Sequence, residues 1–543
     1  MGRARTVSWR VPGRLPPKPT SFAERYAAGA LNEFYALEPG DVKNALELPR
    51  PVDRSALAAA LGAYADRLGA PRQAYDQLER LRHPDSRVVV TGQQAGLLLG
   101  PTYTLSKAVT ALRLAAQLST DAKPVVPVFW VASQDHDTAE VDHAYLLDSA
   151  ENLHKLTVPL PKGVAAGRAP LQPVWLEALL ADMAHIADNP AHLAEVSALL
   201  RGAATVSETF ADLFAALLYR LLGAHGLVVI NPLEPETAPL FKPLLAAELA
   251  QGVASATAVN EAGERVAAHG FSAQLGRGAG ATNLFLEEMG SGTPQRQLLR
   301  FAADRFATDT AEYMPAEVVK IVAADPIRGT PAAGLRPISQ DFALPTAVTV
   351  VGPGELRYFA QLGGVYELHQ VAMPLIWPRA TVTVLEPPVV RILKKFDLEA
   401  AELTQNFAEL KAEKLLELHG HAHLFEDAAE TLDTSLETML TQLRAIDPTL
   451  LGTLSRSEER LRTTLDVLKT KTARALARED DIYTRQFDRL EKHLLPLGTP
   501  QERLISPFSF FLKFGVQPVL AAFLAVPPEG DHTVTLLRGD VTW

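Results

Sequence analysis

Short apolar runs alternate with helical patterns through the middle of the chain, and the run at residues 124–132 is the most informative of them. It reads PVVPVFWVA and stops abruptly at the polar sequence SQDHD of residues 133–137. A run this rich in Val, Phe and Trp predicts a strand that is buried on both faces, as in a parallel sheet. Because ligands bind at the carboxyl ends of strands in open α/β sheets, the polar residues should lie on the floor of a site.

Three further apolar runs, at residues 87–90, 227–230 and 347–351, predict strands of the same kind. Each ends in a cluster of polar residues or glycines, and a helical pattern follows the first and the last of them. Strands that alternate with helices favour an α/β fold with a doubly wound, mostly parallel sheet. The polar clusters should then meet at one edge of that sheet and line a common cleft.

The composition changes along the chain and predicts four regions. Residues 1–80 are rich in Ala and Leu and should form a mostly helical segment packed on the core, while residues 81–388 should form the α/β core with its insertions. Residues 389–495 have little glycine and should form a helical coiled-coil domain. Residues 496–543 are aromatic, with a strand pattern at 533–537, and should return to the core.

Apolar side chains repeat at coiled-coil spacing in the helical region. Two triplets have spacings of four and then three residues: Leu403, Phe407 and Leu410, and Leu461, Leu465 and Leu468. Asp447 followed by Pro448 suits a helix start, so one helix is expected from there to about residue 495, on the order of 70 Å long. Such seams commonly pair between chains, which predicts a homodimer through the coiled coil.

Composition and charge narrow the classes of partner. The net charge of −11 argues against nucleic acid, and an anionic substrate would need a local cluster of Arg and Lys. The chain has no cysteine, which excludes disulfides, thiolate metal sites and a cysteine nucleophile. We find no secretory signal pattern and no apolar stretch of the roughly 18 residues that a membrane span needs, so we expect a cytoplasmic protein without a membrane partner.

The turn after the first predicted strand suits contact with a ligand. Its glycines allow the backbone to approach a ligand, and the next helix would offer free amides to an anion. Thr91, Gln93 and Gln94 are the candidate binding residues, although the turn is neither a Walker A loop nor a GxGxxG motif. Tyr103 and Lys107 follow one helical turn apart, and Lys107 is either a contact for a phosphate or carboxylate or a solvated lysine.

The QDHD cluster carries acid–base potential. Asp135 and Asp137 flank His136, and a histidine held by a carboxylate can accept a proton. A metal site is the alternative, on three residues that would share one face if the stretch were helical: His136, Glu140 and His143. A helix cap with solvated acids is a third interpretation.

The sequence GPGE after the last predicted strand opens a helix. Gly352 and Gly354 allow the backbone to approach a ligand closely, and the start of a helix attracts an anion. Glu355 is the acidic residue of the same turn and a further candidate.

Two segments upstream of this turn add candidates. Arg336 could clamp a carboxylate or phosphate with both arms of its guanidinium, and Gln340 lies one helical turn further on. The alternative for Arg336 is an ion pair with Asp341 or Glu355. Asn283 lies in the sequence ATNLF, and the interpretation that we favour for its side-chain amide is a bond to its own loop.

Five blocks of this sequence together resemble one family, the BshC proteins of bacillithiol synthesis. In chain order they are TGQQAGLLLGPTYTLSKA (91–108), PVVPVFWVASQDHDTAEVDHAYLL (124–147), ATNLF (281–285), LRPISQDFALPT (335–346) and VGPGELRYFAQL (351–362), which contains Gln361. A sixth block, QERLISPFSFFLKFG (501–515), matches more weakly. The resemblance spans nearly the whole chain in the right order, and several of the blocks are long and unusual.

The resemblance implies a Rossmann-like core similar to that of nucleotidyltransferases, with connecting insertions, and a coiled coil used for dimerisation. It implies a ligase that joins the carboxyl group of L-cysteine to the amine of glucosaminyl-malate and so forms bacillithiol in the last step of its synthesis. Family members resemble nucleotide binders, which implies ATP or ADP as a cofactor without settling how cysteine is activated. No metal is expected in the site.

This chain departs from the family pattern in three places. Val351 stands where the family commonly has a glycine, and residues 331–334 read PAAG where it tends to have Ser-Pro-Asn-Val. In the weaker block Ser506 replaces a usual Asn, and Ser509 with Phe510 replaces a usual Tyr-Tyr pair. The last change puts a nucleotide contact in that block in doubt.

The resemblance and the residues together suggest a mechanism for amide formation. His136, oriented by Asp135 or Asp137 and preceded by Gln134, would take the proton from the amine. Gln93, Gln94 and the amides after Gly354 would position the acyl group or its oxyanion. Arg336 and Lys107 would hold the carboxylates of malate or a phosphate.

Two hypotheses from other functional classes stay open at this point. One is a metal-dependent hydrolase or transferase that uses His136, Glu140 and His143. The other is a non-catalytic scaffold in which the coiled coil is the active part and the cleft is vestigial.

Overall fold

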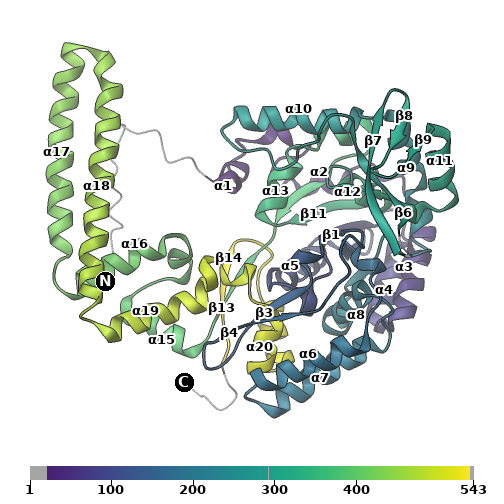
Figure 1. Ribbon diagram of the computed structural model, residues 1–543, viewed down its shortest axis with the longest axis horizontal. Helices are drawn as coiled ribbons and strands as arrows, with labels where there is room; N and C mark the ends of the chain where they lie inside the picture. Colours follow the sequence, from purple (N-terminus) through teal and green to yellow (C-terminus); the bar gives the residue numbers. More distant parts are fainter. Residues whose placement is uncertain (1–20, 291–292, 538–543) are drawn as a thin grey trace. The chain divides into compact units, whose positions relative to one another are not determined.

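The computed structural model describes residues 21–290 and 293–537 (Figure 1). The chain forms two compact units. The core unit comprises Phe22–Val384 and the segment from Gln501 onward, and the helical unit comprises Leu385–Pro500. The first 20 residues of the predicted N-terminal segment lie outside the described residues; the part from Phe22 on belongs to the core unit.

The core unit is built on a five-stranded parallel sheet with the order β12-β11-β1-β2-β5. Its strands are β1 (Arg87–Gln93), β2 (Val125–Val131), β5 (Val228–Ile230), β11 (Thr346–Val351) and β12 (Leu375–Pro378). All seven residues of β2 are buried, so the predicted burial on both faces is confirmed. The order reverses beside β1: the chain runs outward through β2 and β5, then returns to place β11 on the other side. Such a switch point is where α/β sheets bind ligands.

Helices cover the parallel sheet, as a doubly wound fold requires. The helix α5 (Tyr103–Leu118) packs on β1 and β2, α2 (Val42–Glu47) packs on β11, and α3 (Arg54–Leu68) and α4 (Arg72–Leu81) pack on β5 and β2. The central helix α8 (Phe210–Leu222) is buried at twelve of its thirteen positions and starts at a capping box between Thr209 and Asp212. The predicted Rossmann-like α/β core is therefore confirmed.

A second sheet lies within the insertion between β5 and β11, and the sequence patterns did not predict it. It is antiparallel, with the order β10-β6-β7-β8-β9. Its strands are β6 (Ala281–Gly290), β7 (Thr293–Ala302), β8 (Arg305–Ala307), β9 (Glu312–Tyr313) and β10 (Gly329–Pro331). Glu287 pairs with Arg296 across β6 and β7, so the polar residues of these strands face one another rather than alternate with an apolar face.

The remaining elements of the core unit connect or edge these sheets. Two small two-stranded sheets complete its strands: the hairpin of β3 (His143–Leu147) and β4 (Leu153–Thr157), and the pair of β13 (Thr381–Leu385) and β14 (Asp531–Thr535), which are far apart in the chain. The predicted strand at 533–537 is thus shifted by two residues. The other helices are α1 (Phe22–Ala27), α6 (Pro173–Ile186), α7 (Pro190–Ala204), α9 (Lys242–Gln251), α10 (Ala254–Ala268), α11 (Pro315–Ala324), α12 (Arg336–Ala343), α13 (Pro353–Phe359), α14 (Gly363–Leu368), α20 (Pro507–Phe514) and α21 (Val516–Leu524).

The helical unit consists of α15 (Pro387–Phe396), α16 (Ala400–Leu418), α17 (Ala422–Ile446), α18 (Leu451–Ala477) and α19 (Asp481–Leu494). Figure 1 shows α17 and α18 side by side as a long hairpin. The prediction of one helix from Asp447 to about residue 495 is wrong. The helix α18 ends at Ala477. Asp480 then caps a new helix by accepting a hydrogen bond from the Tyr483 amide at 2.8 Å.

The two predicted seams have different surroundings within the helical unit. Leu403 is fully buried, and Phe407 and Leu410 pack against the same small core. On α18, Leu465 packs against that core, whereas Leu461 and Leu468 are 50% and 55% exposed. No helix in the described part of the chain is long and apolar enough to cross a membrane.

Candidate active site

A cavity of about 710 Å³ opens at the carboxyl edge of the parallel sheet, where β1 and β11 lie side by side. Its volume falls within the range of small-molecule sites. It is lined by residues of both sheets: Gly92, Gln93, Gln94, Tyr103, Lys107, Gln134, Asp135, His136, Glu140, Gln274, Leu275, Arg277, Phe285, Arg296, Pro331, Ala332, Ala333, Arg336, Gly352, Pro353, Gly354, Glu355, Tyr358, Arg379 and Arg503. The polar clusters that follow β1, β2 and β11 thus meet in one site, as the sequence predicted.

The turn after β1 is held by Lys107. Its ammonium group is buried, forms an ion pair with Glu355, and donates hydrogen bonds to the Gly92 carbonyl at 2.9 Å and to Gln93 Oε1 at 3.0 Å. Burial lowers the pKa of Lys107, while Glu355 opposes the shift. The interpretation as a solvated lysine is therefore wrong. Because one carboxylate already compensates its charge, Lys107 is a weaker anion contact than the sequence suggested.

The chain itself uses some of the amides at the start of the helix after β1. α5 begins only at Tyr103, ten residues after the end of β1, and the amide of its first-turn neighbour Thr102 donates to the Ile505 carbonyl at 2.8 Å. The Thr104 amide donates to the Pro101 carbonyl at 3.0 Å, so two amides near the predicted anion site are used by the chain itself. Gln93 serves the turn as well, since its Nε2 donates to the Tyr103 hydroxyl at 3.1 Å.

The helix start after β11 is also occupied by the protein. Glu355 Oε2 accepts the Gly352 amide at 2.8 Å, so a carboxylate lies where the sequence predicted an anionic ligand. Gly352 and Gly354 nevertheless line the cavity, and nothing lies within 4 Å of the place that a Cβ atom of Gly354 would take. This turn therefore leaves room for a ligand but does not provide a site that attracts an anion.

An acidic edge of the cavity is organised by Gln94. Its Nε2 donates to Asp135 Oδ2 at 2.6 Å and to Glu140 Oε2 at 2.7 Å. An amide donor is neutral and therefore adds no positive charge beside the two carboxylates. This edge therefore suits a positively charged group of a ligand, such as an ammonium.

His136 is held by a cation and not by the carboxylates that flank it in the sequence. Its Nδ1 lies 3.1 Å from Arg296 Nη1, whereas the nearest Asp135 oxygen lies 3.9 Å away. Asp137 is exposed and lies outside the cavity lining. The prediction that Asp135 or Asp137 orients the ring is wrong. Burial lowers the pKa of His136, and the charge of Arg296 lowers it further.

Three arginines of the cavity have neutral hydrogen-bond partners. Arg336 donates to Gln340 Oε1 at 3.2 Å and to the Tyr358 hydroxyl at 2.8 Å, and Arg277 donates to Asn283 Oδ1 at 2.8 Å. Arg296 donates to the Thr330 hydroxyl at 2.8 Å and the Pro331 carbonyl at 2.7 Å. Among the described residues none of these three has a carboxylate within ion-pair distance, so the predicted pairing of Arg336 with Asp341 or Glu355 does not occur.

Two of these arginines are connected to buried carboxylates only indirectly, through hydrogen bonds of other side chains. Gln340, which accepts from Arg336, donates to Asp341 Oδ1 at 3.0 Å. Asn283, which accepts from Arg277, donates to the Ser255 hydroxyl at 3.0 Å, and Ser255 donates to Glu248 at 2.5 Å. An amide therefore separates each guanidinium from its nearest buried acid. We call Arg277, Arg296 and Arg336 the arginine cradle.

The cavity as a whole is cationic. Six lysine and arginine side chains line it against three carboxylates, although the chain carries a net charge of −11. Arg379 is compensated by the buried Glu502 at 2.5 Å, and Arg503 is exposed. This is the local cationic cluster that an anionic substrate requires in an acidic protein.

Five predicted site residues do not line the cavity, and four of them support it. Thr91 donates to the Val350 carbonyl at 3.0 Å and ties β1 to β11. Gln361 accepts from the amides of Gln274 and Leu275 at 2.7 and 2.9 Å and shapes the loop that carries Arg277. Gln340 and Asn283 position the cradle, as described above, and Asp137 contributes only a turn. The expectation that Asn283 bonds only to its own loop is too narrow.

The alternative metal ligands are not assembled in one place. The stretch after His136 is a single 3₁₀ turn (Thr138–Glu140) followed by β3, so the residues do not share a helical face. Glu140 accepts a hydrogen bond from Gln94, and His143 Nδ1 forms a hydrogen bond with Asp142 Oδ1 at 2.9 Å. In the described ranges no group of three His, Cys, Asp or Glu residues could hold a metal ion.

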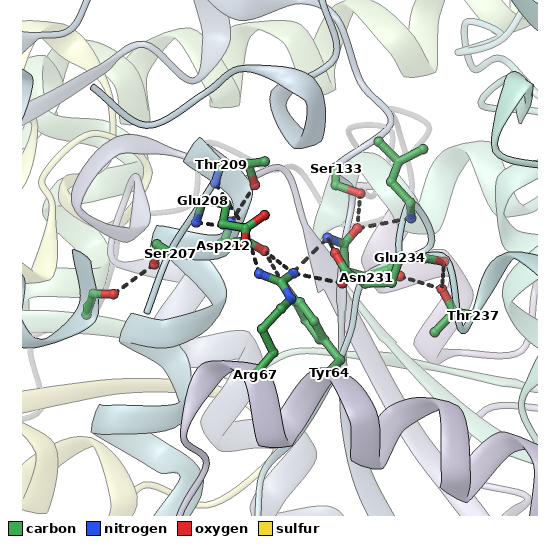
Figure 2. Close-up of polar contacts among 12 residues, drawn as sticks. Tyr64, Arg67, Ser133, Ser207, Glu208, Thr209, Asp212, Asn231, Glu234 and Thr237 are labelled. Atoms are coloured by element: carbon green, nitrogen blue, oxygen red, sulfur yellow. Dashed lines mark hydrogen bonds and ion pairs between the residues drawn. The ribbon is translucent and has the colours of Figure 1, made fainter. Parts of the chain in front are cut away.

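A buried polar network lies at the same edge of the sheet, where Ser133 follows β2 and Asn231 follows β5 (Figure 2). We call it the Arg67 network. Arg67 forms ion pairs with Asp212 at 2.9 Å and Glu234 at 2.7 Å, and the Tyr64 hydroxyl also donates to Asp212 at 3.1 Å. Asn231 donates to Glu234 at 2.9 Å and accepts from Ser133 at 2.5 Å. The network thereby anchors the residue that immediately precedes the QDHD cluster.

Sequence reasoning missed the part of the site that comes from the insertion. Arg277, Phe285 and Arg296 belong to the loop before the second sheet and to its strands β6 and β7. The guanidinium carbon of Arg296 lies 3.9 Å from the centre of the Phe285 ring, and that ring lies 5.6 Å from the ring of His136. The only signal for these residues was Phe285 itself, which closes the ATNLF block.

Comparison with known proteins agrees with this architecture. Two family models match the chain: "Bacillithiol biosynthesis BshC, N-terminal Rossmann-like domain" over residues 17–380 and "Bacillithiol biosynthesis BshC, C-terminal coiled-coil domain" over residues 382–537. A protein of Thermus thermophilus named "Putative cysteine ligase BshC" is 40% identical over 507 residues, which cover 93% of this chain and 98% of the relative. One of the same name from Salinibacter ruber is 33% identical and covers 86% of this chain and 85% of the relative. The chain therefore belongs to the BshC family of bacillithiol biosynthesis.

Proposed function

We propose that this protein is a cytoplasmic ligase that joins the carboxyl group of L-cysteine to the amine of glucosaminyl-malate, which forms bacillithiol as the last step of its synthesis. The observation that carries the proposal is that the arginine cradle and an acidic edge line the same cavity. Glucosaminyl-malate has two carboxylates and one amine, so its charges match both parts. The names of the relatives support the cysteine half of the reaction.

The cradle is suited to the malate carboxylates because its charge is uncompensated. A guanidinium binds a carboxylate with two parallel hydrogen bonds, and each charged hydrogen bond is worth about 1.5–3 kcal/mol. Arg336 and Arg277 are held in place by amides, which fix their geometry and leave their charge for the ligand. The acidic edge at Asp135 and Glu140 would hold the amine as an ammonium before it reacts.

A carboxylate and an amine do not form an amide without activation, and we propose ATP as the activating nucleotide. The cationic lining of the cavity fits phosphate groups as well as carboxylates, and the arginines are the residues that would hold them. In the weakly matching C-terminal block, Arg503 lines the cavity, but the two residues that replace the usual Tyr-Tyr pair offer no such contact. Ser509 is buried and bonded to Leu147, and Phe510 is buried as well.

We further propose that two copies pair through the helical unit. Leu461 and Leu468 continue a coiled-coil seam on α18 and are half exposed, so a second helix would cover apolar surface there. Light scattering at increasing protein concentration should give the mass of a dimer. A double variant, Leu461→Glu with Leu468→Glu, should give a monomer with unchanged helix content, and a parent chain that is monomeric at all concentrations would contradict this part.

The reaction is tested directly by mass spectrometry. The protein is incubated with L-cysteine and glucosaminyl-malate, with and without ATP, and the amide product is sought by its mass. We expect product in the arm with ATP, and a large loss of product in the Arg336→Met variant. Arg201→Met is the matched control, since Arg201 lies outside the cavity lining and pairs with Glu177. No product in either arm from folded protein would contradict the proposal.

A further inference from the structure

The contact between Arg296 and His136 determines which nitrogen of the histidine ring carries its proton. Arg296 Nη1 lies 3.1 Å from His136 Nδ1. A guanidinium has five N–H donors and no acceptor. In this hydrogen bond Nδ1 must therefore supply the lone pair, and in a neutral ring the proton must lie on Nε2.

Arg296 is itself held firmly in its donating position. Its other nitrogens donate to Thr330 and to the Pro331 carbonyl, and its plane lies over the Phe285 ring. Burial lowers the pKa of Arg296 to about 10, which leaves the guanidinium charged near neutral pH. The Arg296 guanidinium therefore remains the hydrogen-bond donor to His136 Nδ1 near neutral pH.

We propose that His136 acts as a neutral hydrogen-bond donor through Nε2–H, fixed in that tautomer by Arg296, and not as the proton acceptor of the reaction. The proposal rests on the proposed function for the identity of the ligand, but not for the tautomer. His136 lines the cavity, and its Nε2 has no hydrogen-bond partner among the described residues. That N–H is therefore available to an oxygen of the substrate, such as the acyl oxygen on which negative charge develops.

A role as base would require a rearrangement that the surroundings oppose. To accept a proton on Nε2, the ring would first have to carry its proton on Nδ1, where it would meet the N–H of Arg296. A doubly protonated ring would place two cations 3.1 Å apart. The other charged groups that act on the ring, Asp135 and Asp137, oppose this repulsion but form no hydrogen bond with it. The ammonium first gives one proton to a carboxylate of the acidic edge. The neutral nitrogen then forms its bond to the acyl carbon, the carbonyl electron pair moves onto the acyl oxygen, and the second proton passes to the acidic edge. When the carbonyl re-forms, the bond to the phosphate-containing group that ATP placed on the carboxyl oxygen breaks, and that group leaves.

The tautomer can be measured without any substrate. Long-range proton–nitrogen correlation spectra of the protein labelled with ¹⁵N-histidine distinguish a protonated Nε2 from a protonated Nδ1, and the His136→Gln spectrum assigns the signal. We expect His136 to be neutral at pH 7 with its proton on Nε2. A proton on Nδ1 would overturn the proposal, whatever the substrates of the protein are.

Turnover of two variants tests the role of the ring. The amide nitrogen of Gln can take the place of Nε2 and donate, but it cannot accept a proton, so His136→Gln should retain activity within about tenfold of the parent. His136→Asn, whose amide reaches only the position of Nδ1, should lose far more. Loss of a general base would instead cost both variants about 10²–10⁴-fold, and that result would overturn the proposal. His143→Gln is the matched control, since His143 lies outside the cavity and bonds to Asp142.

The pH profile separates positioning by Arg296 from a merely structural effect. In the parent the acid limb of kcat/KM reports protonation of His136. Removing the adjacent positive charge in Arg296→Met raises the pKa of His136, so the acid limb should move to higher pH. A limb that stays in place while activity falls would show that Arg296 does not act through His136. If the proposed substrates give no turnover at all, the proposed function fails, and the tautomer measurement still decides this inference.

Discussion

A single arginine, Arg67, and the three arginines of the cradle lie at the carboxyl edge of one parallel sheet, and they differ in what compensates their charge. Arg67 pairs with two carboxylates, Asp212 and Glu234, whose side chains are 1% and 11% exposed. The arginine cradle on the other side of β2 has amide, hydroxyl and carbonyl partners instead. The Arg67 network can hold the fold together but cannot attract an anion, whereas the cradle can attract one because no carboxylate pairs with it. Whether carboxylates compensate the charge of an arginine, rather than where the arginine lies in the fold, therefore decides whether it is structural or binds a ligand.

The largest effect should come from breaking the Arg67 network. Asp212→Asn removes the carboxylate that accepts Arg67, Tyr64 and the Thr209 amide. Removal of one partner of a buried ion pair costs about 3–5 kcal/mol, so the free energy of unfolding in urea should fall by that amount. Activity per folded molecule should stay near the parent value. A stability loss below about 1 kcal/mol would show that the network is not structural.

The opposite pattern is expected for the cradle. Arg336→Met should weaken binding of glucosaminyl-malate by about 1.5–3 kcal/mol, or roughly 10- to 150-fold, since it removes charged hydrogen bonds to the ligand. The free energy of unfolding should change little, because no carboxylate loses its partner. Calorimetric titration and urea denaturation measure the two quantities. Arg336→Lys keeps the positive charge but lacks the planar guanidinium that can form two parallel hydrogen bonds. Its affinity for glucosaminyl-malate should lie between those of the parent and Arg336→Met.

A carboxylate introduced beside the cradle should compensate the charge of one arginine, as Asp212 and Glu234 compensate Arg67. Asn283→Asp puts a negative charge beside Arg277, where the amide oxygen now lies 2.8 Å away. Unit charges about 4 Å apart interact by about 4 kcal/mol at an effective dielectric constant near 20. The ligand should lose only part of this energy, so its affinity should fall by about tenfold. Asn283→Ser is the control that removes the amide without adding charge. Unchanged affinity in Asn283→Asp would mean that Arg277 does not face the ligand.

The smallest effect should come from salt. Added salt screens the interaction of an open cationic cavity with its ligand, but it screens a buried ion pair far less. Raising the ionic strength should increase the KM for glucosaminyl-malate a few-fold. The difference in unfolding free energy between the parent and Asp212→Asn should stay constant over the same range. A KM that is independent of salt would contradict a role for uncompensated charge.

The parallel sheet and its edge could be predicted from local patterns. Residues 87–90, 124–132 and 347–351 are short apolar runs that end in polar or glycine-rich sequences, and they form β1, β2 and β11, whose ends line the cavity. Such runs favour buried strands, and parallel strands bring their ends together. The antiparallel sheet could not be predicted in this way, because β6 and β7 carry polar pairs such as Glu287 with Arg296 and show no clean alternation.

The sequence by itself determined which segments are buried and which polar residues lie at their ends, because burial follows from local composition. Only the tertiary structure decided which charge each of those residues meets. His136 meets Arg296, 160 positions away, rather than its neighbours Asp135 and Asp137, and Lys107 meets Glu355 rather than water. Hydrogen-bond partners depend on how distant segments pack, and packing is a property of the whole chain. The chemical role of a site residue is set by those partners, so it becomes visible only when the chain has folded.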